Sequence, residues 1–290
     1  MRSRRQEVQR FAMFALVPLS IFTLVLVVPF IRGVYFTFTD WDGFDVTRFV
    51  GFENYAVVFQ DQPFWASLTL TLAYVAASVV LVNLVAFALA LLVTIPLRGV
   101  GALRTTFFVP NLIGGVILGL IWQFLFGQAL PVIAESTGMP LFADNWLLDT
   151  TTAFWAMVIV TVWQMSGYMM IIYVTALLAV EPELLEASLI DGANALQTLA
   201  YMKLPLMAQA FTISLFLTMR NAFMGYDVNL ALTGGNPYRT TELISMHVFK
   251  EAFGFGNFAS GQTQAVIMFV VISIAAITQV VISKKFEVQR

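Results

Sequence analysis

The chain has 290 residues, of which 59% are hydrophobic and only 11% are charged, and its mean hydropathy is +0.84. A soluble domain carries about 25% charged residues, so this chain lacks the charge needed to cover a soluble core. The composition excludes an ordinary soluble globular protein and favours an integral membrane protein. Because cysteine is absent, disulfides, thiolate chemistry and cysteine-ligated metals are also excluded.

Long apolar runs follow one another along the chain, separated by short charged segments. Crossing the hydrocarbon core of a bilayer takes about 20 helical residues, and helices satisfy their own backbone hydrogen bonds in lipid. We therefore predict an all-α integral membrane protein with a single transmembrane domain over residues 1–290. Its six transmembrane helices are expected near residues 11–33, 66–94, 105–127, 151–179, 205–225 and 262–283.

The first run follows several arginines, a pattern that secretory signal peptides share. The run is too long for the apolar region of a signal peptide, and no small-x-small cleavage sequence follows it before Arg32. We expect a retained transmembrane helix.

Lys and Arg are distributed unevenly between the segments that are expected on the two sides of the membrane. If the N-terminus is cytoplasmic, residues 1–10, 95–104, 180–203 and 284–290 are also cytoplasmic and hold ten of the fifteen basic residues. Basic residues favour the cytoplasmic side, so both termini are expected there. The ten residues are Arg2, Arg4, Arg5, Arg10, Arg98, Arg104, Lys203, Lys284, Lys285 and Arg290.

Residues 181–203 depart from this charge pattern because they are acidic, with four carboxylates against one lysine. An acidic cytoplasmic segment favours a basic protein partner over the anionic lipid leaflet. Within it, Pro182 is expected to begin a helix, Gly192 to interrupt it, and a second helix to end near Pro205. Leucines at helical spacing give each short helix an expected packing face: Leu185 and Leu189, then Leu196 and Leu199.

This segment closely resembles the "EAA" loop of ATP-binding-cassette importer permeases: E-A-A, three residues, G, nine residues, then I-x-L-P. Residues 186–188, Gly192 and residues 204–205 match it, while Ser188 replaces the second Ala and Met202 replaces the Ile. In that family the loop is a pair of coupling helices that docks on the ATPase subunit. The resemblance therefore implies a type I importer permease fold with a coupling loop at 181–203. The residues expected to couple to the ATPase are Glu186, Ala187, Asp191, Gly192, Ala193, Leu204 and Pro205.

Three further segments resemble the carbohydrate importers of this family, of the same general type as one maltose-transporter permease. Residues 233–237 are similar to their T-G-G-x-P turn after the fifth helix, residues 51–55 and 63–65 to their first external loop, and residues 253–261 to the glycine-rich approach to their last helix. Their order around the EAA loop implies a sugar importer.

No catalytic or metal-binding constellation competes with this interpretation. The single histidine, His247, cannot form a metal site or a charge relay, and we expect a solvated role for it in an external loop. Carboxylate pairs such as Asp40 and Asp42 are expected to be solvated. Because the chain has no G-x-x-x-x-G-K-[ST] sequence, ATP and Mg²⁺ are expected on a separate ATPase chain, with no cofactor bound here.

Polar and aromatic residues within the fourth and fifth spans are candidates for the sugar pathway, because polar groups are costly in a bilayer. From the resemblance, the expected substrate contacts are Tyr168, Thr218 and Asn221, with Gly225 shaping the same surface, and Gln164 is added as a polar residue of the fourth span. Each also has a structural interpretation: Tyr168 as packing and Gln164 as an interhelical hydrogen bond. Asn83 is expected to join helices, and Arg220 to reach the outer interface or to pair with Asp227.

The resemblance implies alternating access in a bacterial or archaeal cytoplasmic membrane. The expected partners are a second related permease, two ATPase subunits, an extracytoplasmic solute-binding protein and membrane lipid, with no nucleic acid. A polyol or a glycerol phosphate remains an alternative substrate, and an ion-coupled secondary transporter an alternative class. The residues identify neither the sugar nor whether the binding protein is periplasmic or lipid-anchored.

Overall fold

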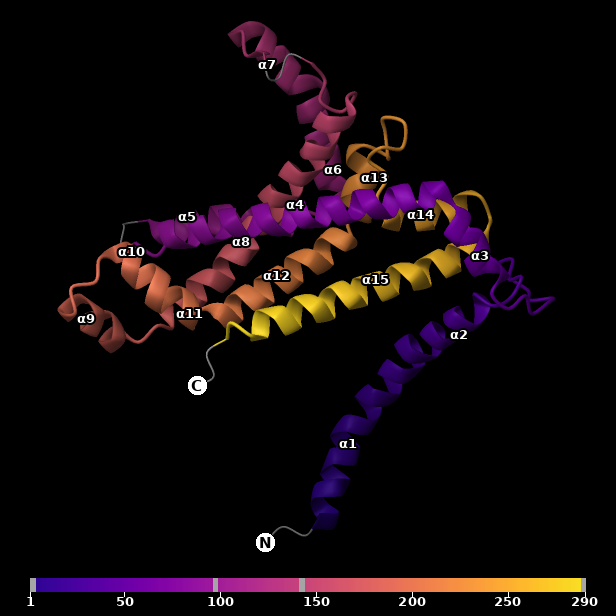
Figure 1. Ribbon diagram of the computed structural model, residues 1–290, viewed down its shortest axis with the longest axis horizontal. Helices are drawn as coiled ribbons and strands as arrows, with labels where there is room; N and C mark the ends of the chain where they lie inside the picture. The colour runs from indigo at the N-terminus through magenta and orange to yellow at the C-terminus, as the bar shows by residue number, and fades with distance from the viewer. Residues whose placement is uncertain (1–3, 96–98, 141–143, 288–290) are drawn as a thin grey trace. The chain divides into compact units, whose positions relative to one another are not determined.

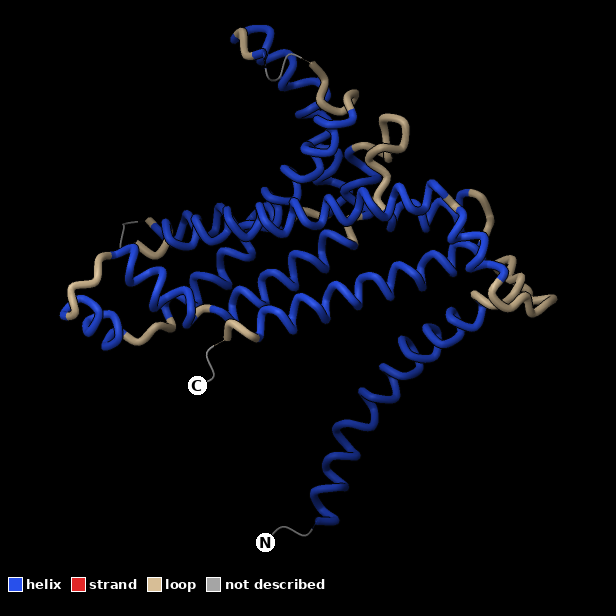
Figure 2. Tube along the Cα trace, in the orientation of Figure 1, coloured by secondary structure: helices blue, strands red, loops and turns tan. Residues whose placement is uncertain are grey.

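The computed structural model describes residues 4–95, 99–140 and 144–287, with only the backbone for residues 4–10. Arg2, Arg98 and Arg290, which contribute to the predicted orientation, lie outside the described residues. The described residues form helices joined by loops and turns, without an extended strand (Figure 2). The chain divides into two compact units, residues 1–62 with 248–269 and residues 63–247 with 270–290. The single domain over residues 1–290 remains a prediction.

The first unit contains α1 (Arg4–Phe22), a π-helical turn (Thr23–Val27), α2 (Val28–Phe36) and α3 (Glu53–Gln60). The loop between α2 and α3 is held by Asp40, whose carboxylate accepts hydrogen bonds from the Thr47 hydroxyl at 2.5 Å and the Arg48 amide at 2.7 Å. These bonds, the Thr47 hydroxyl first, lower the pKa of Asp40 below its usual value. Asp42 accepts the Phe44 and Asp45 amides in the same way. Both carboxylates therefore stabilise a turn in an exposed loop.

The second unit contains the other helices, which Figure 1 labels along the chain. The long ones are α4 (Gln62–Leu92), which begins at the unit boundary, α8 (Thr150–Leu178) and α12 (Ala208–Phe223), together with the later part of α15 (Phe258–Lys284). The shorter ones are α5 (Val100–Phe108), α6 (Gly115–Phe124), α7 (Leu130–Thr137), α9 (Pro182–Ile190), α10 (Ala195–Thr198), α11 (Leu204–Leu206), α13 (Tyr226–Leu232) and the first four residues of α14 (Ile244–Phe249), whose last two residues belong to the first unit.

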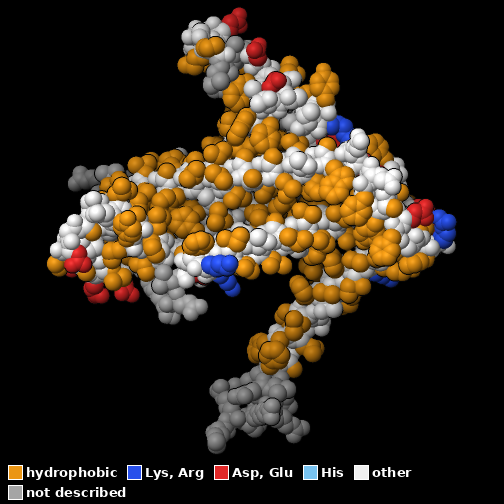
Figure 3. Space-filling model, viewed as in Figure 1, with side chains coloured by type: hydrophobic (Ala, Val, Ile, Leu, Met, Phe, Trp, Pro, Cys, Tyr) orange, Lys and Arg blue, Asp and Glu red, His pale blue; other side chains and the backbone are white. Residues whose placement is uncertain are grey.

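Five helical stretches are long and apolar enough to cross a membrane, and a bent pair raises the number to six. The five are Phe11–Phe36, Gln62–Leu92, Gly115–Thr137, Thr150–Leu178 and Phe258–Lys284. Hydrophobic side chains cover much of the visible surface of the helices in Figure 3, and charged side chains gather in small groups. Such an apolar exterior suits contact with lipid.

The predicted third span, 105–127, is misplaced by about ten residues. The charge-free run contains α5, then a 3-10 turn (Val109–Leu112), an extended break at residues 113–114, and only then α6. Pro110 has no amide hydrogen to continue the helix, and Gly114 adopts an extended conformation. The apolar stretch that can span a membrane therefore begins at Gly115.

The predicted fifth span, 205–225, is also corrected at its start. The stretch Ala195–Leu206 meets α12 at an angle of 69°. Pro205 lies in the last short helix before this bend, and Met207, the residue at the bend, is buried. The predicted second helix ending near Pro205 is confirmed, and the straight span begins only at Ala208.

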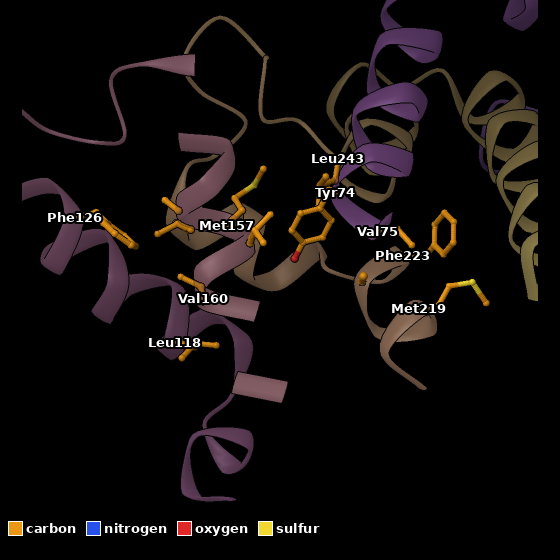
Figure 4. Packing of buried hydrophobic residues seen from close by; sticks show 13 residues of the cluster. Tyr74, Val75, Leu118, Phe126, Met157, Val160, Met219, Phe223 and Leu243 are labelled. Carbon is orange, nitrogen blue, oxygen red and sulfur yellow. The ribbon is translucent and has the colours of Figure 1, made fainter. Parts of the chain in front are cut away.

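The interior of the second unit is largely hydrophobic and is built around α4 and α8. One cluster includes Tyr74, Met157 and Phe223, and Figure 4 shows Tyr74 among its packed side chains. The other includes Val82, Tyr173 and Met207.

Asn83 on α4 joins three helices within this apolar interior. Its side-chain oxygen accepts hydrogen bonds from the hydroxyls of Tyr173 on α8 and Ser214 on α12, each at 2.6 Å. Its nitrogen donates to the Val79 carbonyl at 2.7 Å and, at 3.4 Å, to the Thr218 hydroxyl. The predicted interhelical role of Asn83 is therefore confirmed.

The N-terminus of α8 is capped by Asp149, which accepts hydrogen bonds from the amides of Thr151 and Thr152 at 3.0 Å each. These bonds, the Thr152 amide first, lower the pKa of Asp149 below its usual value. The cap fixes where the fourth apolar span begins. Its observed bounds, Thr150–Leu178, lie within one residue of the predicted ones.

Candidate functional site

The segment that resembles the EAA loop forms two short helices joined by a tight turn. Pro182 occupies the first turn of α9, where its missing amide hydrogen is not needed. The chain then reverses at Gly192, whose φ of +78° is a left-handed conformation that glycine adopts without a side-chain clash. Asn194 begins α10 with a reciprocal capping box to Gln197. The predicted break at Gly192 is therefore confirmed.

Two buried hydroxyl groups meet between these helices, and Leu185 and Leu199 are half-buried. Ser188 on α9 and Thr198 on α10 are buried, and their oxygens lie 3.3 Å apart. The predicted packing face is wrong for Leu189 and Leu196, which are 68% and 75% exposed. Ser188 is the departure from the second Ala of the motif, and its hydroxyl makes this contact.

The surface of this segment combines acidic and apolar groups. Glu186, Ala187 and Asp191 are exposed, and Ile190 is 87% exposed beside them. A hollow of about 290 Å³ next to the turn is lined by Asp191, Gly192, Ala193, Gln197, Thr198, Tyr201 and Met202. It brings together three of the predicted coupling residues, whereas Leu204 and Pro205 lie half-buried further along the chain. Figure 1 shows this segment at one end of the second unit.

A second hollow, of about 160 Å³, lies between α6, α8, α12 and α13. Its lining residues are Tyr74, Gly115, Thr161, Gln164, Met165, Asn221, Met224, Gly225, Asp227 and Val228. We refer to it as the polar cavity. It brings together three predicted substrate contacts: Gln164, Asn221 and Gly225. Drug-sized ligands occupy pockets of about 300–1,000 Å³, so this cavity can hold only part of an oligosaccharide.

Hydrogen bonds fix the orientation of several polar groups in the polar cavity. The Tyr74 hydroxyl and the Thr161 hydroxyl lie 2.5 Å apart, which joins α4 to α8. The Gln164 side-chain nitrogen donates to the Ile113 carbonyl at 3.2 Å, which fixes the side chain where the chain breaks before α6. Gln164 therefore bonds to the break before α6 instead of to a helix, and the same bond holds it at the cavity wall.

Tyr168 and Thr218 lie outside the polar cavity. Tyr168 lines a larger, mostly aliphatic cavity of about 790 Å³ between α8 and residues 205–217. Thr218 is fully buried, and its hydroxyl donates to the Ser214 carbonyl at 2.8 Å. Substrate contact remains a prediction for all five residues.

Three polar residues of the cavity were not among the predicted substrate contacts: Tyr74, Thr161 and Asp227, of which Asp227 was considered as a partner of Arg220. Thr161 lies three residues before Gln164 on the same face of α8, so helical spacing was sufficient to find it. Tyr74 and Asp227 come from other helices, and only the tertiary packing brings them here. Asp227 forms no ion pair with the exposed Arg220 among the described residues, so the predicted pairing is not seen.

The prediction of a solvated His247 is wrong. His247 is in α14 and is only 2% exposed, and its Nδ1 lies 3.0 Å from the carboxylate of the fully buried Glu242. Arg239 donates to the same carboxylate at 2.6 Å. A buried carboxylate is costly without such partners, so the histidine is held inside by the charge that it helps to stabilise. Among the described residues, no group of three or more acidic or histidine side chains is arranged to hold a metal ion.

A family model described as "Binding-protein-dependent transport system inner membrane component" matches residues 101–288. The probable starch degradation products transport system permease protein AmyD of Thermoanaerobacterium thermosulfurigenes is 42% identical over 266 residues, covering 92% of this chain and 91% of that protein. The multiple sugar-binding transport system permease protein MsmF of Streptococcus mutans is 29% identical and covers 95% of each chain.

Solved structures support the fold. A bacterial ABC transporter involved in the import of the acidic polysaccharide alginate matches with a TM-score of 0.84 at 18% identity, covering 97% of this chain and 98% of that one. At this identity the likeness concerns the fold alone. The predicted type I importer permease fold is confirmed.

Proposed function

Since the chain belongs to the family of binding-protein-dependent transport system inner membrane components, we propose that it is one permease subunit of an ATP-driven importer for a sugar or oligosaccharide. The chain is a membrane transport subunit and not an enzyme. The observation that carries the sugar assignment is the polar cavity, in which amide, hydroxyl and carboxylate groups converge within an apolar helical unit. Sugars need such hydrogen-bonding groups beside apolar walls. The similarity to permeases named for starch degradation products and multiple sugars supports the same substrate class.

We further propose that this chain works with a second permease chain. The polar cavity, about 160 Å³, is too small for an oligosaccharide, and Asn221 and Asp227 on its wall are exposed in the single chain. A second permease packed against this wall would enlarge and enclose the site. An extracytoplasmic binding protein would deliver the sugar, and alternating access of the permease pair would carry it across the cytoplasmic membrane, with both termini of this chain in the cytoplasm.

The coupling role belongs to α9, α10 and the turn between them. Glu186 is exposed on α9, and exposed apolar side chains such as Leu189 and Ile190 lie near it. Exposed apolar patches with a charged rim are typical of protein interfaces. The proposed partner is a pair of ATPase subunits that bind ATP and Mg²⁺, with a basic group opposite Glu186.

Co-purification from native membranes in mild detergent tests this proposal. Wild-type chain is expected to bring down an ATPase and a second permease, whereas Glu186→Ala is expected to lose the ATPase and keep the permease. Glu181→Ala is the matched control, because Glu181 is also exposed and its side chain makes no capping hydrogen bond. Wild-type chain that purifies alone and transports sugar in vesicles without ATP would refute the importer.

A further inference from the structure

The polar cavity contains one charged side chain, and its sign restricts the substrate. Of the ten lining residues, Asp227 alone carries a formal charge, and it is negative. Arg220 is the nearest basic residue in the sequence, but it does not line the cavity. An anionic solute entering the cavity would therefore meet a carboxylate without a cation of the cavity wall to compensate it.

The Asp227 carboxylate is available to a ligand. Among the described residues, no hydrogen bond or ion pair engages it, and the residue is exposed at the start of α13. By contrast, the hydroxyls of Tyr74 and Thr161 bond to each other. A carboxylate accepts hydrogen bonds and donates none, so Asp227 is suited to the hydroxyl groups of a sugar.

The backbone of α6 lets Asp227 approach the cavity. A Cβ atom on Gly115 would lie 2.7 Å from the Asp227 Cβ and 3.6 Å from its Oδ2. A side chain at position 115 would therefore push Asp227 away, and glycine allows the close packing of α6 against α13.

We propose that Asp227 is a specificity-determining residue, which accepts hydrogen bonds from a neutral sugar and excludes anionic solutes such as uronic acid oligosaccharides and sugar or glycerol phosphates. Repulsion of the wrong ligand is a common source of specificity. The fold does not decide this point, since a transporter of the same fold is involved in the import of the acidic polysaccharide alginate. The proposal rests on the proposed sugar importer and names the charge class of its substrate.

Sugar binding to the purified membrane complex, with the second permease and the ATPase but without the binding protein, tests the assignment. Three probes of nearly equal size are compared: a neutral glucose tetrasaccharide, the same sugar with one C6 oxidised to a uronate, and the methyl ester of that uronate. Wild type is expected to bind the ester like the neutral sugar and the uronate at least about tenfold more weakly, because like charges closer than about 12 Å weaken binding by that factor or more at an effective dielectric constant of about 20. High salt is expected to reduce this difference.

Three variants distinguish the effect of the Asp227 carboxylate from the effect of a negative charge elsewhere on the chain. Asp227→Asn is expected to bring the difference between uronate and ester below about threefold, whereas Asp144→Asn, which removes the same charge outside the cavity, is expected to keep it. Gly115→Ala is expected to weaken binding of the neutral sugar and to reduce the discrimination, because it displaces Asp227. Equal binding of uronate and ester by wild type, or equal relief by Asp227→Asn and Asp144→Asn, would overturn the inference and leave the sugar importer intact. Wild-type complex that binds none of the three sugars would overturn this inference, whereas the proposed function is refuted separately, by wild-type chain that purifies alone and transports sugar without ATP.

Discussion

Replacing Asn83 by alanine should destabilise the chain measurably, because it removes the acceptor shared by two hydroxyls. Tyr173 and Ser214 donate to the Asn83 side chain at 2.6 Å each. An interhelical hydrogen bond in a membrane protein contributes about 0.6 kcal/mol on average and at most about 1.7 kcal/mol. The two bonds together therefore account for about 1.2 kcal/mol. Truncating a buried side chain adds a packing loss, so we expect about 2 kcal/mol in all.

The free energy of unfolding in mixed detergent micelles measures this effect. A double-mutant cycle of Asn83→Ala with Tyr173→Phe isolates one bond, because the second change keeps the ring and removes only the hydroxyl. We expect a coupling energy of about 0.6–1.7 kcal/mol. Tyr168→Phe is the matched control, since the Tyr168 ring contacts Phe108 and no hydrogen bond of its hydroxyl is seen among the described residues. A coupling energy indistinguishable from zero would refute the reasoning. A loss of stability in Tyr168→Phe equal to that in Tyr173→Phe would refute it as well.

Three further predictions concern positions where backbone geometry or charge is constrained. Gly167→Ala should prevent α5 from packing on α8, because an added Cβ would overlap the Phe107 carbonyl group, whose carbon is only 2.5 Å away. A thermal melt should show a large loss of stability for this variant. Gly101→Ala should melt almost as wild type does, because no atom lies within 4 Å of a Cβ added at Gly101. Gly192→Ala should destabilise the turn between α9 and α10 by about 1 kcal/mol, the cost of a left-handed conformation for alanine, and reduce ATPase recovery in the co-purification assay. The pKa of Asp149 is lower in the folded chain than in the unfolded chain, where it is about 3.8. Its carboxylate therefore stabilises the fold above pH 3.8, and this stabilisation is lost as the pH falls through the folded pKa. The difference in stability between wild type and Asp149→Asn should shrink below about pH 3.8.

Opposite results would identify which argument is at fault. A Gly167→Ala variant as stable as Gly101→Ala would mean that α5 and α8 are not in the close contact described. A Gly192→Ala variant with wild-type stability would show that the left-handed conformation at residue 192 does not require glycine. A difference between wild type and Asp149→Asn that grows toward low pH would contradict the sign of the pKa shift.

The transmembrane helices were predictable to the extent that charge marks their ends. Residues 151–179 were assigned within one residue of α8, where the Asp149 cap precedes a long run without charge. The third span was displaced because no charge interrupts residues 105–134, and the break depends on Pro110 and the extended Gly114. Helix-breaking proline and glycine residues inside an apolar run have to be considered separately from the charge pattern.

The polar cavity was only partly predictable. Gln164 and Asn221 stood out as polar residues in apolar spans, where such groups need a reason. Tyr74 did not, and Asp227 was considered only as a charge near Arg220, because their place in the cavity depends on α13 packing against α6 and on the contact between α4 and α8. Similarly, the burial of His247 depends on Glu242, a residue whose own burial no local pattern indicates.

The bend before α12 joins two helical arms of the second unit at a single residue. The stretch Ala195–Leu206 is separated from α12 by Met207 alone, and Met207 is buried at the corner. Asn221 lies 14 residues beyond Met207, roughly 21 Å along the helix at about 1.5 Å per residue. A rotation of about 10° about this pivot therefore displaces Asn221 by about 4 Å. Because one arm leads from the proposed coupling segment and the other carries Asn221 of the cavity wall, a rotation of this size would change the width of the cavity by more than the length of a hydrogen bond.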